Sequence, residues 1–153
     1  MTAPPILKHI DDLTTYRIAP GDTVKLTHLT GPSEGSATSV FFEIWEPNGV
    51  QPDNSHPDSV EIFIILNGAG KAVSDEHSVD LKAGDVLVLP SGSVHHIQNT
   101  SATERLYAVT IMANDLGAMK HGFEHLVTSG KPEVFGAQDK GAIFTGLAAL
   151  ATD

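Results

Sequence analysis

The sequence predicts an all-β domain, an antiparallel β-barrel or jelly roll with short helical segments near its C-terminal end. The central part of the chain contains short runs rich in β-branched and aromatic residues. Turn signals separate these runs at close spacing, a pattern typical of sandwiches and barrels. The chain of 153 residues also contains 14 glycines and 9 prolines, which suits a fold with many turns.

The core barrel is expected between residues 39 and 112. The turn sequence Glu46-Pro47-Asn48-Gly49 ends the first run, and Pro90-Ser91-Gly92 ends a later one, because Pro, Gly and Asn favour turns. Short strands at 6–10 and 24–29 would extend the edge of the barrel. The expected strands of the barrel itself are 39–45, 61–66, 71–73, 78–81, 85–89, 94–99 and 106–112.

The C-terminal extension, residues 115–153, has a different pattern. Apolar residues spaced by three and four predict a helix over 116–126, and Gly130-Lys131-Pro132 interrupts it. Residues 142–151 are apolar and could form a terminal helix, packed on the barrel or on a second subunit.

The length favours a single domain, residues 1–153, because two domains would be cramped. The apolar tail near Phe144, Leu147 and Leu150 would suit the interface of a homodimer. A gel-filtration mass that matches one chain would contradict this expectation.

Charge and composition exclude several classes of function. The chain has 19 Asp and Glu against 9 Lys and Arg, a formal net charge of −10, which argues against binding to nucleic acid or to anionic lipid. The absence of cysteine excludes disulfides, thiolate metal sites and a cysteine nucleophile. No apolar run approaches the roughly 20 residues that cross a bilayer. Since the N-terminus also does not resemble a secretory signal, we expect a cytoplasmic protein that binds a small molecule.

The clearer of two motifs is G-x5-P-x-G-x2-H-x3-N, formed by Gly84, Pro90, Gly92, His95 and Asn99. Gly84 allows a tight turn into a strand, and Pro90 with Gly92 turns the chain after it. The next strand then begins with His95 facing inward. Asn99 can hold the following turn through hydrogen bonds of its side chain.

The other motif is G-x4-N-x-H-x4-E-x6-G, formed by Gly49, Asn54, His56, Glu61 and Gly68. In an extended chain alternate side chains share a face, so Asn54 and His56 would point the same way. A turn after His56 would place Glu61, the first residue of the next strand, beside it. A carboxylate inside a barrel is costly unless it is paired or bound to a metal.

Together the two motifs resemble those of the cupin superfamily, small β-barrel proteins with two metal-binding motifs. The second motif matches at every fixed position. The first departs from G-x5-H-x-H-x3,4-E-x6-G at two points: the gap after Gly49 is one residue short, and Asn54 replaces the first His. The resemblance covers residues 40–112 and implies that His56, Glu61 and His95 converge on one divalent metal. Fe, Mn, Ni, Zn, Co and Cu all accept such ligands.

A second register of the first motif has His56 and Asp58 as ligands together with His95, which would form a facial triad for non-haem iron. The gap from Asp58 to Glu61 is then too short for the motif, so the first register is preferred. Asn54 would lie in the substrate pocket, as a weak ligand or a hydrogen-bond partner of bound water.

Other residues have less support from the pattern. Phe63, two residues after Glu61, is expected to line the pocket or to fill the core. Glu43 could line the pocket as an acid or base, or point to solvent. His96 must face away from its neighbour His95, and His121 and His125 are expected on the surface.

The resemblance implies three classes of function. The first is a metal-dependent enzyme that acts on a small molecule, with an oxygenase or lyase-type reaction. The second is an isomerase, epimerase or hydrolase acting on a sugar or small acid. The third is a barrel that binds a small molecule without catalysis. A single fold hosts many functions, so the fold does not decide among them.

Overall fold

The computed structural model of the protein describes residues 2–113, 123–128 and 130–151. Its helices are α1 (His125–Thr128) and α2 (Ala137–Leu150), with single 3-10 turns at Ile10–Asp12 and Pro32–Glu34. Its strands are β1 (Thr14–Arg17), β2 (Val24–Thr30), β3 (Thr38–Trp45), β4 (Glu61–Asn67), β5 (Ala69–Ser74), β6 (His77–Lys82), β7 (Val86–Leu89), β8 (His95–Asn99), β9 (Leu106–Ala113) and β10 (Lys131–Val134).

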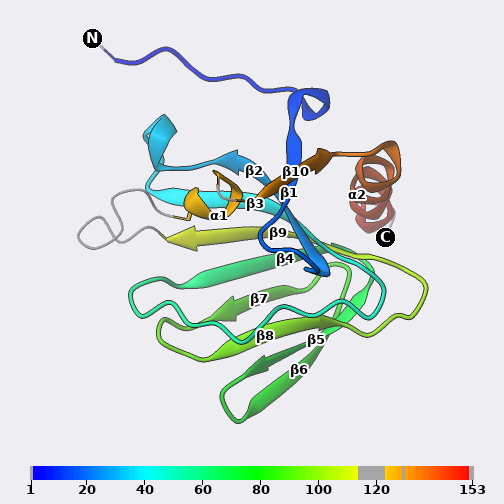
Figure 1. The fold of residues 1–153 in the computed structure, drawn as a ribbon. Coiled ribbons are helices and arrows are strands. Elements are labelled where there is room, and N and C mark those ends of the chain that lie inside the picture. The colour runs from blue at the N-terminus through cyan, green and yellow to red at the C-terminus, as the bar shows by residue number, and fades with distance from the viewer. Residues whose placement is uncertain (1, 114–122, 129, 152–153) are drawn as a thin grey trace.

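The strands form two sheets. The larger has the order β10-β1-β2-β3-β9-β4-β7 and the smaller the order β6-β5-β8, with the smaller sheet below the larger in Figure 1. Every strand pairing is antiparallel. The predicted all-β fold, an antiparallel jelly roll with few and short helices, is confirmed.

Alternation along the strands gives the larger sheet two buried faces. In β4, Glu61, Phe63 and Ile65 are buried on the inner face, because alternate side chains of a strand point the same way. Phe63 and Ile65 join a core of apolar residues from both sheets, among them Trp45. The inner face therefore holds the core and, at the start of β4, a buried carboxylate.

Helix α2 covers part of the outer face. Ile143 of α2 lies in a cluster with Leu66 and Tyr107, side chains from β4 and β9. Asn67 donates a hydrogen bond from Nδ2 to the carbonyl oxygen of Ala142, at 3.0 Å. At Gly146 the helix comes so close to β4 that a Cβ atom would lie 2.1 Å from the carbonyl oxygen of Leu66. This glycine therefore permits the close packing of α2 on the sheet.

We expect Gly146→Ala to lower the free energy of unfolding by about 1–3 kcal/mol, since the added methyl group forces α2 away from the sheet. Gly141→Ala is the matched control, because a Cβ atom at Gly141 has open space in the same helix. Alanine has the higher helix propensity, so the control should be neutral or stabilising by up to about 1 kcal/mol. Urea denaturation followed by circular dichroism measures both. Equal effects of the two substitutions would contradict the packing described here.

An ion network ties α2 to the strands. Glu46, directly after β3, contacts Arg17 at 3.0 Å, Lys25 at 3.0 Å and Arg105 at 2.8 Å. Arg105 in turn contacts Asp139 of α2 at 2.8 Å. Partial burial opposes the charge of Glu46, but its cationic partners outweigh it and lower the pKa of Glu46 to about 2. Glu46 therefore stays ionised and links β1, β2 and the start of β9.

The ends of the chain differ from the prediction. The strand expected at 6–10 is absent from the structure, and this part ends in the single turn Ile10–Asp12. Instead, Thr14–Arg17 and Lys131–Val134 pair with each other, Tyr16 opposite Pro132. Proline is compatible with β10 because this strand lies at the edge of the sheet, where one side of the backbone needs no partner.

The helices of the tail also differ from the prediction. Residues 114–122, which hold most of the helix expected at 116–126, lie outside the described residues. The described part that follows contains the short α1. Helix α2 begins at Ala137, five residues before the expected start, and exposes Phe144, Leu147 and Leu150 by 43–55 %. The homodimer through these side chains stays a prediction.

Candidate metal centre

The structure brings His56, Glu61 and His95 together. One potential ligand atom from each residue lies within 4.8 Å of the other two. Glu61 Oε2 is 2.8 Å from His95 Nε2 and 3.8 Å from His56 Nε2. Two imidazoles and one carboxylate at this spacing are a donor set that suits zinc and other divalent transition metals.

Local structure explains how residues far apart in the sequence meet here. Glu61 and His95 are the first residues of β4 and β8, whereas His56 lies in the segment before β4. Asn54 and His95 form an isolated bridge, with N–O distances of 3.0 and 2.9 Å between their backbones. The amide of Gly92 donates to the carbonyl of His56 at 3.0 Å. The segment that carries His56 is therefore fastened to the turn and strand that carry His95.

Hydrogen bonds orient the imidazole of His95. Its Nδ1 lies 3.0 Å from the carbonyl oxygen of Ser93, so this nitrogen carries a proton and donates it. Nε2 then faces Glu61. A backbone carbonyl that holds one ring nitrogen while the other faces the metal is common around bound metals. Ser93 thus presents the correct nitrogen of His95 to a metal.

Burial and charge shift the pKa values of the two histidines. Burial lowers the pKa of His56. Burial also opposes protonation of His95, but the hydrogen bond and the charge of Glu61 outweigh it and raise the pKa of His95. Glu61 is 5 % exposed and has no Lys or Arg partner among the ion pairs of the described residues. A buried carboxylate between two imidazoles is favourable when a cation is bound.

His56 and Glu61 line a cavity of about 290 Å³, and His95 contacts Glu61 behind this wall. Its apolar wall comes from Ile18, Ala19, Val24, Leu26, Phe41, Pro52, Met112 and Leu126. Its polar wall comes from Asp22, Glu43, Gln51, Asn54, His56, Glu61 and Thr110. Lys and Arg are absent from this lining within the described part of the chain. The volume of the cavity is at the small end of the range for ligand sites, and its apolar wall excludes water on one side.

Glu43 lies on the inner face of β3 and faces this cavity, which answers the question that the sequence left open. Its side chain is 4 % exposed. Thr110 Oγ1 donates a hydrogen bond to Glu43 Oε2 at 2.7 Å, and Gln51 Nε2 donates to Oε1. Burial and the negative charge of Glu61 outweigh these donors and raise the pKa of Glu43 to about 8. The carboxyl group is thus largely neutral at pH 7.

This pKa predicts a pH-dependent stability. The folded protein keeps the proton of Glu43 up to about pH 8, whereas the unfolded chain releases it near the usual value of 4.5. The free energy of unfolding should therefore fall as the pH rises from 4.5 to 8, by at most about 1.4 kcal/mol per unit. Glu43→Gln should remove this slope, and Glu76→Gln, at an exposed acid, should keep it. Urea denaturation of metal-free protein at pH 5 and pH 8 measures it. A slope unchanged in Glu43→Gln would contradict the assignment.

The two residues predicted for the substrate pocket differ in their placement. Asn54 lines the cavity, and its Nδ2 donates to the carbonyl oxygens of Pro52 and His95 at 3.1 and 3.2 Å. Its amide nitrogen is thus used to hold the backbone. Phe63 is fully buried in the core against Trp45, with ring centroids 6.1 Å apart, and is not among the residues of the cavity wall. Phe63 points to the inside of the fold, as its spacing from Glu61 predicted, but it lies deeper than the cavity.

The second motif performs the structural tasks that its residue types suggest. Asn99 is fully buried, and its Nδ2 donates to the carbonyls of Glu46 and Glu104 at 2.9 and 2.7 Å. Its Oδ1 accepts from the amide of Ser101 at 2.9 Å. Gly84 and Gly92 have φ angles of +93° and +82°, which favour glycine. Asn99 therefore holds the turn after β8, as predicted.

The remaining candidate ligands lie elsewhere. Asp58, the ligand in the alternative register, is exposed and outside the cavity wall. His96 faces away from His95 and contacts Asp53 at 2.6 Å. His125 is exposed on α1, and His121 lies outside the described residues. Gln51 and Thr110 contribute to the site without any motif signal, although the inward parity of Thr110 in β9 was a usable clue.

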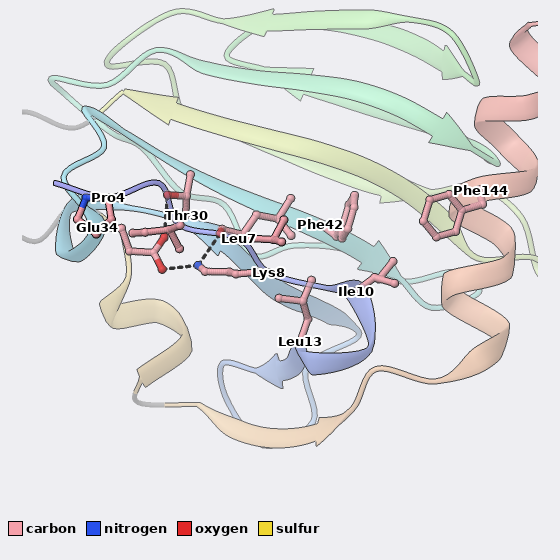
Figure 2. Close-up of a pocket in the computed structure, with 11 residues that line it drawn as sticks. Pro4, Leu7, Lys8, Ile10, Leu13, Thr30, Glu34, Phe42 and Phe144 are labelled. Atoms are coloured by element: carbon pink, nitrogen blue, oxygen red, sulfur yellow. Dashed lines mark hydrogen bonds and ion pairs between the residues drawn. The ribbon is translucent and has the colours of Figure 1, made fainter. Parts of the chain in front are cut away.

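A second hollow of about 620 Å³ lies between the N-terminal arm and strands β2 and β3, with Phe144 of α2 at one end (Figure 2). Leu7, Phe42 and Phe144 line it, and the charged side chains of its lining pair with each other. Lys8 pairs with Glu34 and donates to the carbonyl of Leu29 at 2.8 Å. This hollow is larger than the cavity at the triad but, within the described residues, lacks a comparable cluster of metal ligands.

Comparison with known proteins decides the family. A model of the cupin domain matches residues 41–112, the segment that contains His56, Glu61 and His95. The chain contains a cupin domain. The family resemblance predicted from the two motifs is thereby confirmed.

Relatives of this cupin include the putative germin-like protein 9-2 of Oryza sativa subsp. japonica, 30 % identical over 86 residues. The match covers 53 % of this chain and 38 % of the rice protein. Several further matches are also germin-like proteins, and the chain spans about a third to a half of their length.

Two solved structures have the same fold. A predicted oxalate decarboxylase from Thermotoga maritima has a TM-score of 0.63 at 23 % identity, over 71 % of this chain and 98 % of that one. A sugar phosphate isomerase of the cupin superfamily from Silicibacter pomeroyi has a TM-score of 0.60 at 20 % identity, over 72 % and 76 %. At these identities the likeness concerns the fold. No described helix of this cupin is long and apolar enough to span a membrane.

Proposed function

We propose that this cupin is a metal-dependent enzyme that acts on a small molecule, with an oxygenase or lyase-type reaction at one divalent transition metal. The observation that carries the proposal is the position of His56, Glu61 and His95, with ligand atoms within 4.8 Å of one another beside the cavity. When bound there, a divalent metal supplies activation of a substrate oxygen and, if redox-active, electron transfer with dioxygen.

The residues of the chain have separate tasks in this proposal. His56, Glu61 and His95 hold the metal, and Ser93 keeps the imidazole of His95 in the orientation that exposes Nε2. Three protein ligands leave coordination positions open for substrate. Leu26, Phe41 and Met112 contribute an apolar wall that excludes water from the bound substrate and strengthens polar contacts inside the cavity.

The names of the relatives and structural neighbours support the class of reaction without fixing it. One neighbour is a predicted oxalate decarboxylase, and another is a sugar phosphate isomerase. A cavity of about 290 Å³ suits a substrate of similar modest size. The lyase and isomerase reactions differ in whether a carbon–carbon bond breaks, so turnover and products distinguish them.

Metal content and metal-dependent turnover test the proposal. Protein purified without a metal-affinity tag is expected to contain close to one equivalent of a divalent transition metal by elemental analysis. Turnover in a screen of small acids and polyols should stop after chelation and return with metal. Turnover that survives chelation would overturn the proposal in favour of a metal-free isomerase. Tight binding of a compound without turnover would overturn it in favour of a binding protein.

A further inference from the structure

The cavity has a second polar group besides the triad, the carboxyl group of Glu43. Glu61 lies opposite Met112 of β9, whereas Glu43 lies opposite Ala108 of the same strand. These backbone positions on β9 are four residues apart, about 13 Å along a strand, but the Glu43 carboxyl group reaches back to Thr110, two residues from Met112. Both carboxyl groups nevertheless line one cavity, because their side chains point into it from different strands. A ligand bound at the triad would therefore extend toward Glu43.

Glu43 is held in a fixed orientation. The amide of Ile97 donates a hydrogen bond to Gln51 Oε1 at 3.0 Å, which leaves the Gln51 Nε2 group to face Glu43. Thr110 donates from the other side at 2.7 Å. These contacts fix both oxygens of the carboxyl group at the cavity wall. Such a preorganised group suits recognition of a ligand better than a free side chain does.

The charges of the cavity restrict which ligand group can lie there. The acids Asp22, Glu43 and Glu61 line it, and the described residues of its wall include neither Lys nor Arg. An anion buried beside Glu43 would lose its hydration without gaining an opposite charge, which is costly. A hydroxyl or amide group can instead donate to one oxygen of Glu43 and accept from a neighbouring donor.

On the basis of the function proposed above, we propose that Glu43, held by Gln51 and Thr110, determines substrate specificity by binding a neutral hydrogen-bonding group. The substrate class is then a compact molecule that chelates a metal with oxygens at one end and carries a hydroxyl or amide at the other. An apolar body between the two ends would contact Leu26, Phe41 and Met112. A second carboxylate or a phosphate at the far end is disfavoured.

A pair of catechols tests this specificity. 3,4-Dihydroxybenzamide and 3,4-dihydroxybenzoate share a chelating end and a ring, and differ only in a neutral or an anionic far end. Their dissociation constants are measured by calorimetry with zinc-loaded and with metal-free protein, without oxygen. We expect zinc-loaded protein to bind the amide about tenfold more tightly or better. Binding is measured at pH 7 and at pH 8.5.

Glu43→Gln removes the charge with little change of shape, since glutamine can accept from Gln51 and donate to Thr110. It should reduce the preference for the amide at pH 8.5 at least about threefold. The control Glu76→Gln, at an exposed acid between β5 and β6, should keep it. Equal binding of the two probes, tighter binding of the benzoate, binding of neither, or an unchanged preference in Glu43→Gln would overturn the inference. Failure to take up zinc would contradict the proposed function instead, and the probes on metal-free protein then decide the role of Glu43.

Discussion

Replacement of His95 by alanine is expected to weaken the binding of zinc or manganese about a hundredfold or more. The reason is that the substitution removes one of three protein ligands, and even loss of a residue that only orients a ligand costs 10- to about 100-fold. The remaining pair, His56 and Glu61, lies 3.8 Å apart and cannot enclose a cation from a third side. Calorimetric titration of metal-free protein measures the change.

His96→Ala is the matched control for this experiment, because it removes the same side chain one position further along β8. His96 faces away from the cavity toward Asp53. Its substitution should leave the metal affinity within about twofold, since it removes no ligand and no partner of a ligand. Equal losses in the two variants would show that disruption of β8, rather than removal of the His95 imidazole, lowers the metal affinity.

Phe63→Ala is expected to lower the free energy of unfolding by about 3–5 kcal/mol, the range typical of a buried phenylalanine that leaves a cavity. Phe63 is 0 % exposed and packs against Trp45 at the centre of the core between the two sheets. Because a small domain has only about 5–15 kcal/mol of stability, this is a large part of the total. Denaturation in urea followed by tryptophan fluorescence measures it.

Val88→Ala, on the neighbouring strand β7, is the control for this substitution. Val88 is 57 % exposed, so its truncation should change the free energy of unfolding by about 0.5 kcal/mol or less. A loss in Phe63→Ala as small as that of Val88→Ala would contradict the position of Phe63 in the core. It would favour a place in the cavity wall, where truncation leaves an opening to solvent rather than a void.

The centre of the fold could be predicted from the sequence because local signals and tertiary structure agree there. The second motif sets a turn, a strand and an inward His95 with residues whose backbone preferences allow little else. The N-terminal and C-terminal segments contain no motif of this kind. Strand β10 contains Pro132, and it forms only because β1 offers an edge to pair with.

The metal ligands of the candidate site could be predicted from the sequence, whereas the other residues that line the cavity were harder to predict. Glu43 follows Phe41 and Phe42 in a run that is apolar on both sides, since the outer face of β3 is also covered, so alternation could not decide its direction. Gln51 lies in an irregular segment, where no period assigns a face. The depth of Phe63 depends on how far the two sheets close, which is a property of the tertiary structure.

We propose that His56, Glu61 and His95 bind one divalent metal. Anomalous diffraction from a crystal soaked in zinc tests it most directly, because the map locates the ion itself. We expect one strong peak about 2.0–2.2 Å from the two Nε2 atoms and the Glu61 carboxylate. A peak confined to surface residues such as His77 and Glu76, or no peak at all, would contradict it.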